Sequence, residues 1–448
     1  MTASLDQDDQ ACDAFRLFRK LVPLDFFDEF DVGHARIYSA WIVVWLMTFQ
    51  RLLGNASLSR AVAELNFGAV SRCLPDCKRV RDGEISSNTG GYSLARSLLP
   101  VEVASRVVDH IFDILVDNQA ASWNGRRVFL VDGTTLSLSH HPELLEQFPP
   151  AENQHGQSHW PIVNLVTAHE LGSGLATRPE WGAMYGPNAV SETRLAKSVM
   201  QRLGGPTMIV ADRNFGIFSV AYTAVELGHG VVARLKDDRF DRMVAAATLI
   251  CPGQWRLSWR PSRWDRNTNP DLPDDALIEG RVIEITIEHE GKPIALRLFT
   301  TDLTASPEEI ADLYGLRWRV ENDIRDMKQT MQMHRLRGQG MEMISREILL
   351  GVAAYNLVVE VKRLAASRAG IEPRRLSFKR TLDLLQAFQD GFDVNENLAE
   401  QNKRYERLLD AVSRCRLPAR GKFRSYPREV IPRTRGFPSR GKSSVHKY

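Results

Sequence analysis

The sequence predicts an α/β protein in which a mixed sheet is flanked by helices. From Arg127 onward, short apolar runs alternate with stretches of helical periodicity, as strands buried between helices do. Apolar residues also recur at steps of three and four through residues 13 to about 120 and again after residue 342, which indicates helical regions before and after the sheet. The length of 448 residues exceeds what one compact core usually holds, so two or three domains are expected.

The N-terminal helical region contains one pattern that is associated with DNA binding. Residues 57–66 and 69–72 are spaced like the two helices of a helix-turn-helix. Such spacing is common by chance, and an ordinary helical pair is the favoured interpretation. The longest apolar stretch, residues 37–49, is too short to span a bilayer and predicts a buried helix.

Several short segments in the middle of the chain have the composition of strands. Residues 128–131 are continuously apolar, as a central strand covered on both faces should be, and this run ends at Asp132. The other predicted strands are residues 161–167 with a partner around 174–177, residues 207–211, which end at Asp212, and residues 230–235. Helices are predicted between them over residues 191–203 and 218–227.

The segment from Lys236 to Thr300 departs from this alternation and predicts a β-rich insertion. Its first part is rich in Pro, Asp and Trp, and residues 281–289 and 295–300 then alternate around a turn. Ser306-Pro-Glu-Glu309 combines capping-box chemistry with a proline at the first helical position, so a long helix should begin there and continue to about Met333. A last helical block is expected over residues 342–414.

Composition restricts the class of protein and its location. The chain is 43% hydrophobic and 25% charged, which is ordinary for a folded protein. Its five cysteines are few and odd in number, and no second ligand pair with zinc spacing follows Cys73 and Cys77. This argues against a disulfide framework and a zinc site and favours a reducing compartment. The acidic start of the chain does not have the character of a secretion signal.

The formal net charge is only +3, but the charge is unevenly distributed. Residues 413–448 hold eleven Lys and Arg and one Glu, so the rest of the chain is net negative. A basic tail of this kind either binds DNA phosphates, releasing their counterions, or is a solvated terminus. Charge alone leaves both interpretations open.

Asp132 and Asp212 are the first candidates for chemistry, because each follows a predicted buried strand of the same sheet. Ligands of open α/β sheets gather at the carboxyl ends of strands. An aspartate in such a position also commonly begins a turn. Taken singly, each residue therefore fits a structural role at least as well as a catalytic one.

The long helix predicted after residue 306 adds a third carboxylate. Relative to Tyr314, the residues Arg317, Glu321 and Lys328 lie at about −60°, −20° and −40° around an ideal helix, so all four share one stripe. An apolar stripe runs beside it through Ile310, Leu313, Leu316, Val320, Ile324, Met327 and Met331. The alternative is an amphipathic helix with ordinary surface ion pairs.

Two aspartates and a glutamate that converge have a specific chemical use. Two Mg²⁺ ions about 3.5–4 Å apart activate the attacking oxygen and stabilise the leaving oxygen of a phosphodiester. Such hard cations require oxygen ligands, and carboxylates also neutralise their charge. Arg317 and Lys328 could then hold phosphate oxygens without competing for the metal.

At this point the sequence resembles a known family. Tyr314-x₂-Arg317-x₃-Glu321-x₆-Lys328 matches the Y-(2)-R-(3)-E-(6)-K signature of insertion-sequence transposases of the type-four DDE family. Val131-Asp-Gly-Thr-Thr and Ala211-Asp-Arg-Asn-Phe-Gly216 resemble the family's motifs around its two catalytic aspartates, although Asn214 stands where a smaller or acidic residue is often found. Residues 92–100 look like a recurring feature of its N-terminal region. The likeness covers about residues 15–430.

The resemblance implies a ribonuclease-H-like mixed sheet interrupted by a β-rich insertion before the glutamate-bearing helix. It implies cut-and-paste transposition, in which water cleaves at the transposon ends and the freed 3′-OH then attacks target DNA. By position, Asp132, Asp212 and Glu321 would bind two Mg²⁺ ions, for which Mn²⁺ would substitute. Tyr314, Arg317 and Lys328 would contact the terminal phosphates.

The implied partners are double-stranded DNA, as terminal inverted repeats and as target, and a second copy of the chain, because two ends must be joined. The implied location is the bacterial cytoplasm, at the nucleoid and without a membrane. The implied domains are a helical DNA-binding domain (1–120), a catalytic domain (121–335, with the insertion at 236–300), a helical region (336–412) and the basic tail (413–448).

Other polar and aromatic residues carry less weight. Some relatives stack a flipped base on a tryptophan of the insertion, but none of Trp255, Trp259 and Trp264 aligns clearly, and core packing is favoured for each. The loop histidines His140, His141, His155 and His159 are interpreted as solvated. The helix dipole explains Glu192 adequately, although a place near the metals is possible. Arg234 and Lys236 could face a DNA cleft.

Two rival functions remain open at the level of sequence. One is a catalytically inactive DNA-binding protein derived from a transposase, against which the intact carboxylates and signature argue. The other is a nuclease of the same fold that cuts DNA without strand transfer.

Overall fold

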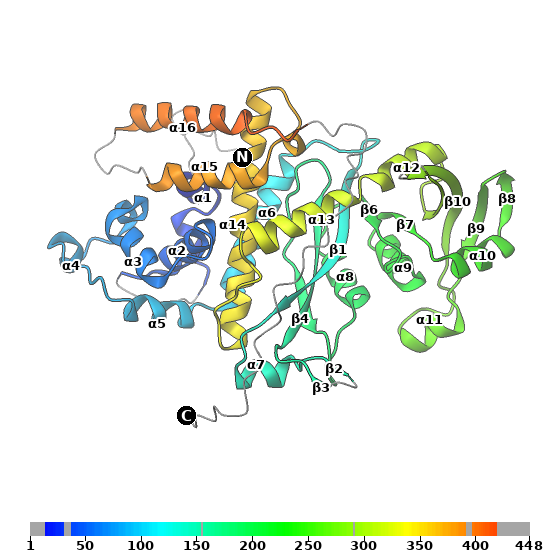
Figure 1. Ribbon diagram of the computed structural model, residues 1–448, viewed down its shortest axis with the longest axis horizontal. Coiled ribbons are helices and arrows are strands. Elements are labelled where there is room, and N and C mark those ends of the chain that lie inside the picture. Colours follow the sequence, from blue (N-terminus) through cyan, green and yellow to red (C-terminus); the bar gives the residue numbers. More distant parts are fainter. Residues whose placement is uncertain (1–13, 31–36, 154–155, 290–291, 391–396, 419–448) are drawn as a thin grey trace, which may run out of the picture.

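The computed structural model describes residues 14–30, 37–153, 156–289, 292–390 and 397–418. Figure 1 shows a bundle of N-terminal helices on one side and a long sheet on the other, with one long helix running between them. Two further helices lie above the N-terminal bundle, and a broken helix crosses in front of the sheet.

The N-terminal region is helical, as predicted. Its elements are α1 (Ala14–Leu21), α2 (Ala40–Leu52), α3 (Leu58–Phe67), α4 (Lys78–Arg81), α5 (Gly90–Leu98) and α6 (Val101–Asp117). Trp45 of the buried helix α2 packs against Phe15 and Phe18 of α1, with ring centroids 5.0 and 5.3 Å apart. After α3 the chain makes only a short 3₁₀ turn, Ala69–Cys73, so the second helix of a helix-turn-helix is not formed.

One mixed sheet of nine strands forms the middle of the molecule, in the order β5-β4-β1-β6-β7-β11-β10-β9-β8. The strands β1, β6 and β7 are mutually parallel, whereas β4 is antiparallel to both β1 and β5. The first five are β1 (Arg127–Ser137), β4 (Ile162–Glu170), β5 (Glu180–Ala183), β6 (Thr207–Ala211) and β7 (Gly230–Arg234), and a separate small pair is formed by β2 (Glu152–Asn153) and β3 (Gly156–Gln157).

Two strand predictions need correction. β1 does not end at Asp132 but continues to Ser137, because β4 pairs with it along residues 129–137 after β6 has stopped. The longer partner of β4 on this side is β5. Residues 174–177 follow a turn at residues 171–173 and meet only the end of β4, through a single antiparallel bridge from Ala176 to His169 and a hydrogen bond from Thr177 N–H to the Ala168 carbonyl. Antiparallel pairing with only one neighbour is sufficient to extend β1 beyond the parallel part of the sheet.

The insertion is β-rich, as predicted, and extends the same sheet. β10 (Ile278–His289) and β11 (Lys292–Thr300) form the expected hairpin, and β11 pairs antiparallel with β7. The preceding part is more regular than its sequence suggested, because it forms α10 (Asp237–Ala245), β8 (Thr248–Cys251), β9 (Gln254–Trp259) and α11 (Arg263–Thr268). The helices α10 and α11 are short and mostly polar, so their sequences show little of the apolar periodicity on which the prediction relied.

The central strands are buried on both faces, and their alternate side chains enter two different cores. Phe129 and Val131 belong to a large core shared with α6, the N-terminal helices and the helices α8 (Glu192–Met200) and α9 (Phe218–Glu226). Val128 and Leu130 enter a smaller core on the opposite face, under the helices α12 (Pro307–Gly315) and α13 (Trp318–Arg325). This alternation decides which face Asp132 occupies.

The segment predicted as one helix from Ser306 to Met333 is broken. It starts with the predicted capping box at Ser306 and Glu309, but α12 ends at Gly315 and α13 begins at Trp318. Arg317 N–H bonds to the Tyr314 carbonyl three residues back, so the joint is a tightened turn. Residues Asp326–Thr330 then form a π-helical turn. Glycine in a helix costs about 1 kcal/mol relative to alanine, which favours a break near Gly315.

The C-terminal block is helical, as predicted, and consists of α14 (Met341–Arg368), α15 (Phe378–Asp390) and α16 (Leu398–Ser413). A short helix α7 (Pro142–Gln147) lies near the start of α14 (Figure 1). Beyond α16, Arg416 bridges to Leu376. The rest of the predicted basic tail, residues 419–448, lies outside the described residues, as does His155. None of the helices that the structure describes is long and apolar enough to cross a bilayer.

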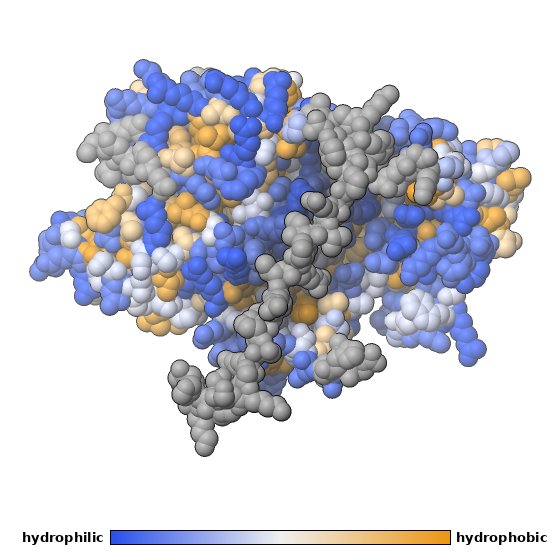
Figure 2. Space-filling model, in the orientation of Figure 1, coloured by the Kyte–Doolittle hydropathy of each residue, from blue (hydrophilic) through white to orange (hydrophobic). Residues whose placement is uncertain are grey.

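Figure 2 shows a mostly hydrophilic face with apolar patches over the N-terminal helices and at the far edge of the insertion. The large apolar side chains that are exposed in these parts of the chain include Phe67 and Leu98, at the ends of α3 and α5, and Leu249 and Ile250 of the edge strand β8.

Candidate active site

The pairing of β1 with β6 places the two candidate aspartates side by side. Val131 is in register with Ala211, the last residue of β6, so Asp132 and Asp212 follow at equivalent points of adjacent parallel strands. Neighbouring strands lie about 4.8 Å apart. By alternation, Asp132 shares the face of Val128 and Leu130, which is the face that α12 and α13 cover. The side chain of Asp212 accepts the Asn214 N–H at 2.8 Å, so the chain turns directly after this residue.

Asp132 is a partly buried carboxylate in a crowded environment. Its Oδ1 accepts the Gly133 N–H at 2.8 Å, and only 21% of its side chain is exposed. Its pKa is raised to about 6, mainly by burial and also by the nearby carboxylates Asp212 and Glu321, whereas Gly133 and Arg317 oppose the rise. The three acidic groups therefore repel one another at a site with one compensating arginine.

Arg317 links the helix to the sheet. Its guanidinium donates to Glu321 Oε1 at 2.6 Å and contacts Asp132 Oδ2 at 3.5 Å. Glu321 remains 59% exposed at its side chain, so it lies at the open side of the cluster. Arg317 lies in the tight turn between α12 and α13, and from there its side chain reaches Asp132 of β1.

Tyr314 and Lys328 extend the same cluster along the sheet. Burial raises the pKa of Tyr314, whose hydroxyl interacts with Arg317 and lies within electrostatic reach of Asp212 and Arg234. Lys328 Nζ donates to Thr134 Oγ1 of β1 at 3.3 Å. The helical hydrogen-bond pattern changes on both sides of Glu321, yet the four signature residues stay on the side that faces the sheet. Tertiary contacts rather than ideal helical geometry hold them there.

Across the described residues, no three His, Cys, Asp or Glu side chains come close enough together to form a ready-made metal site. Arg317 contacts both Asp132 and Glu321, so a cationic side chain occupies the space between these carboxylates. The donor set is nevertheless made only of carboxylate oxygens, which suits a hard divalent cation.

Glu192, the first residue of α8, approaches the cluster from the opposite face of the sheet. A Cβ atom built on Gly133 would lie 2.9 Å from Glu192 Oε1, so the absence of a side chain at Gly133 is what admits this carboxylate. Burial raises the pKa of Glu192, and the charge of Asp212 raises it further. The helix dipole alone, which explained Glu192 from sequence, does not account for this position.

A buried ionic clamp that the sequence did not reveal holds α13 from behind. The guanidinium of Arg374 contacts the Asp323 carboxylate, and it also donates to the carbonyls of Leu171 and Glu170 at 3.0 and 2.9 Å. Asp323 is 4% exposed and lies two residues after Glu321. No sequence signal connects Arg374 to this helix, because the two residues are distant in the chain and Arg374 lies in a short 3₁₀ turn, Pro373–Arg375, between two helices.

The aromatic candidates of the insertion take different positions. Trp259 is buried against Phe218 and Phe299, and Trp255 packs edge-on against Phe240, so both support the core as expected. Trp264 on α11 is 58% exposed, and core packing is wrong for this residue. His140 and His159 are exposed, as expected, but their rings stack on each other at 4.2 Å.

A family model described as "Transposase DDE domain" matches residues 123–357, which is more than half of the chain and includes all six candidate residues. The chain belongs to the DDE transposases. The transposase is also similar to the transposase InsG for insertion sequence element IS4 of Escherichia coli (strain K12), with 26% identity over 332 residues. That alignment covers 72% of this chain and 71% of the relative, which supports membership of the IS4 family.

Membership of this family implies that the protein binds DNA, cleaves it and transfers its strands. It also implies the use of a divalent metal ion. The matched region begins just before β1 and ends within α14. It therefore contains both aspartate-bearing strands, the insertion and the broken helix.

Proposed function

We propose that this transposase carries out cut-and-paste transposition with Asp132, Asp212 and Glu321 as the ligands of two Mg²⁺ ions, for which Mn²⁺ substitutes. The observation that supports this most directly is the register of β1 and β6. It brings the two aspartates to adjacent positions under α13, where Arg317 contacts both Asp132 and Glu321.

The residues fit such ions by their chemistry. A divalent cation would relieve the mutual repulsion that contributes to the raised pKa of Asp132. When bound, the metal ions activate an attacking oxygen and stabilise the leaving oxygen of a phosphodiester. Arg317 would then exchange its carboxylate partners for a phosphate of the transposon end, since guanidinium binds both groups with the same planar donors. Tyr314 and Lys328 would hold further terminal phosphates beside it.

The route for DNA follows β1 in this proposal. Thr135, Ser137, Lys328, Gln329 and His334 line a hollow of about 950 Å³ beyond Asp132, counting the open solvent at its mouth. Water attacks first at the transposon end, and the freed 3′-OH then attacks target DNA at the same site. Because two ends must be joined, the active form is a homodimer on two terminal inverted repeats.

The proposed domains follow from this route. Residues 121–335 form a ribonuclease-H-like catalytic domain, which the strand order β5-β4-β1-β6-β7 supports, with the insertion at residues 236–300. Residues 1–120 bind DNA, residues 336–412 support the catalytic domain, and residues 413–448 form a basic arm.

Replacing Glu321 by alanine should reduce Mg²⁺-dependent cleavage of a terminal-repeat duplex by about 10⁴-fold or more. The reason is that the three proposed metal ligands act together, so the loss of one removes most of the activity. DNA binding measured without metal should persist. Glu308→Ala removes an exposed carboxylate of α12 and serves as the matched control, with cleavage close to wild type. Comparable cleavage by Glu321→Ala would show that this residue is not a metal ligand.

The same assays separate the two rival functions. A wild-type protein that binds terminal repeats but never cuts them would be an inactive DNA-binding derivative. Supplying pre-cut ends with a target plasmid tests strand transfer directly, because a nuclease of the same fold would give no joined product.

A further inference from the structure

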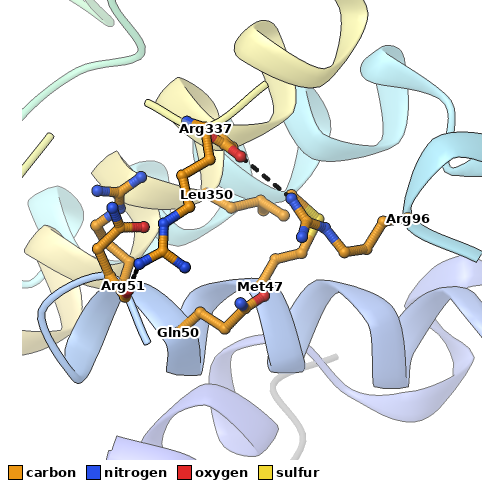
Figure 3. A pocket seen from close by; sticks show the side chains of 8 residues that line it. Met47, Gln50, Arg51, Arg96, Arg337 and Leu350 are labelled. Carbon is orange, nitrogen blue, oxygen red and sulfur yellow. Dashed lines mark hydrogen bonds and ion pairs between the residues drawn. The ribbon is translucent and has the colours of Figure 1, made fainter. Parts of the chain in front are cut away.

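A hollow lined by three arginines lies between the N-terminal helices and the segment that follows the broken helix. It has a volume of about 330 Å³, counting the open solvent at its mouth. Arg51 comes from the end of α2, Arg96 from α5, and Arg337 from the segment before α14, as Figure 3 shows. None of these residues belongs to the carboxylate cluster around Asp132.

The charge in this arginine hollow is unbalanced. Glu347 of α14 is the only carboxylate among the residues that line it, against three guanidinium groups. Arg51 is 4% exposed, and its pKa is lowered to about 10, mainly by burial and also by the charges of Arg337 and Arg96, whereas Glu347 opposes the change. Burying cations without matching anions is costly, so the hollow favours an incoming anion.

The guanidinium groups are held in place but retain free donors. Arg51 donates to the carbonyl of Gln332 at 2.9 Å, and Arg337 donates to the carbonyl of Asn55 at 2.6 Å. Arg96 Nη2 donates to Glu347 Oε1 at 3.1 Å, whereas its buried Nε finds no acceptor among the described residues. Each guanidinium has five N–H groups, and these contacts use only some of them.

The hollow also explains part of the segment 92–100, for which the catalytic site gives no role. Tyr92 is fully buried, and its hydroxyl donates to Gln50 Oε1 at 2.7 Å, beside Arg51. Arg96 lies one helical turn later on α5, with its guanidinium 5.7 Å from the centre of the Tyr92 ring. The segment therefore forms one wall of the hollow and supplies Arg96, the arginine whose buried Nε lacks a hydrogen-bond acceptor among the described residues.

We propose that the arginine hollow binds a phosphate group, and that this phosphate belongs to the DNA backbone. Arginine matches the geometry of phosphate oxygens through paired N–H donors. Arg51 and Arg337 tie the turn after α2 to residues 332–337, which begin four residues after Lys328, so a phosphate bound here would couple the N-terminal helices to the catalytic segment. The DNA source rests on the proposed function, and free inorganic phosphate offers the same chemistry.

Thermal unfolding of the full chain with inorganic phosphate tests the site itself, against chloride at equal ionic strength. A ligand that binds only the folded state raises its Tm with concentration. Wild type should show a saturating rise, and Arg96→Gln should lose at least half of it. Glu347→Gln should show a larger rise than wild type, because the competing carboxylate is gone. Arg368→Gln is the charge-matched control. Arg368 lies at the far end of α14 and pairs with Asp410 of α16, and both side chains are partly exposed.

Duplex binding at several salt concentrations, without divalent metal, tests the source of the phosphate. Loss of one phosphate contact lowers the slope of log affinity against log salt by about 1. We expect this change in Arg96→Gln and not in Arg368→Gln. Arg337→Gln, at a more exposed position, replaces Arg96→Gln if that variant does not fold.

If phosphate raises the Tm but Arg96→Gln leaves the slope of log duplex affinity against log salt unchanged, the site exists and binds free phosphate rather than the DNA backbone. Equal phosphate responses in wild type, Arg96→Gln and Glu347→Gln, together with equal slopes, would overturn the proposal. Both measurements are independent of cleavage, so a failure of the proposed catalytic function would appear separately in the Mg²⁺ assay.

Discussion

Gly216 closes the turn after Asp212 and lies directly against the backbone of β7. A Cβ atom at this position would stand 2.3 Å from the carbonyl oxygen of Arg234, a distance that real structures do not tolerate. The obstacle is main chain, which cannot rotate away as a side chain can. The glycine at the end of the second motif is therefore explained by close approach of two backbone segments, one of which carries a candidate metal ligand.

Gly216→Ala should lower the free energy of unfolding by about 1–3 kcal/mol through overpacking, and it should also reduce cleavage, because the turn that carries Asp212 must shift. Urea unfolding and the Mg²⁺ cleavage assay would measure the two effects. Gly204→Ala is the matched control in the loop before β6, where a Cβ atom meets nothing within 4 Å. It should change the free energy of unfolding by less than about 1 kcal/mol. Equal effects of the two substitutions would contradict this explanation.

The element that carries Glu321 is held by the rest of the fold more than by its own helical geometry. α13 has only eight residues and is interrupted on both sides, so it has little stability of its own. Val320 and Ile324 pack it on the sheet, and Arg374 fastens it to the end of β4 from behind. This arrangement positions Glu321 without any direct contact between Arg374 and the candidate metal ligands.

Removing Arg374 should be costly because it leaves the Asp323 carboxylate buried without its partner. We expect Arg374→Met to lower the free energy of unfolding by about 3–5 kcal/mol, and the double variant with Asp323→Asn to recover part of that loss. Arg368→Met breaks an ion pair whose side chains are 45% and 46% exposed, and it should cost less than about 1 kcal/mol. A urea-unfolding cycle over the single and double variants gives the coupling between the two residues.

A positioning role for Arg374 makes a second prediction that stability alone does not. At a temperature where Arg374→Met remains folded, cleavage should need a higher Mg²⁺ concentration to reach half of its maximum, while duplex affinity without metal stays the same. Wild-type metal dependence in a folded variant would leave Arg374 with a purely structural role.

At the scale of the whole molecule, the helices before and after the catalytic segment share one hydrophobic core with the sheet. Residues of α2, α6 and α14 belong to the same continuous cluster as Phe129 and Val131 of β1. The C-terminal end of the described chain is also attached to this body. Ser377 N–H bonds to the Cys415 carbonyl at 2.8 Å, and Leu417 N–H bonds to the Arg375 carbonyl at 2.7 Å, next to the Arg374 clamp.

This attachment divides the proposed basic tail into two parts with different roles. Truncation after Pro418 should preserve the Tm while weakening duplex binding and flattening its salt dependence, because most of the tail's basic residues lie beyond this point. Truncation after Ser413 should in addition lower the Tm, because it removes the strand-like contacts beside Arg374. If neither truncation changes the salt dependence of duplex affinity, the tail does not bind DNA and is a solvated terminus.

The sequence by itself predicted most of the order of helices and strands, the two aspartates that follow buried strands of one sheet, and the glutamate within a spaced signature. These features rest on local rules, such as apolar runs for buried strands and capping residues for helix starts, and the spacing of the signature sufficed to indicate the family. Where the elements were short and polar, as in α10 and α11, periodicity was too weak to reveal them.

Only the tertiary structure decided how far β1 extends, where the long helix breaks, and which distant side chains meet. Arg374 and Asp323, or Arg51 and Arg337, are far apart in sequence and are brought together by packing of whole elements. Such contacts depend on the relative positions of helices and strands, and no local pattern encodes those positions.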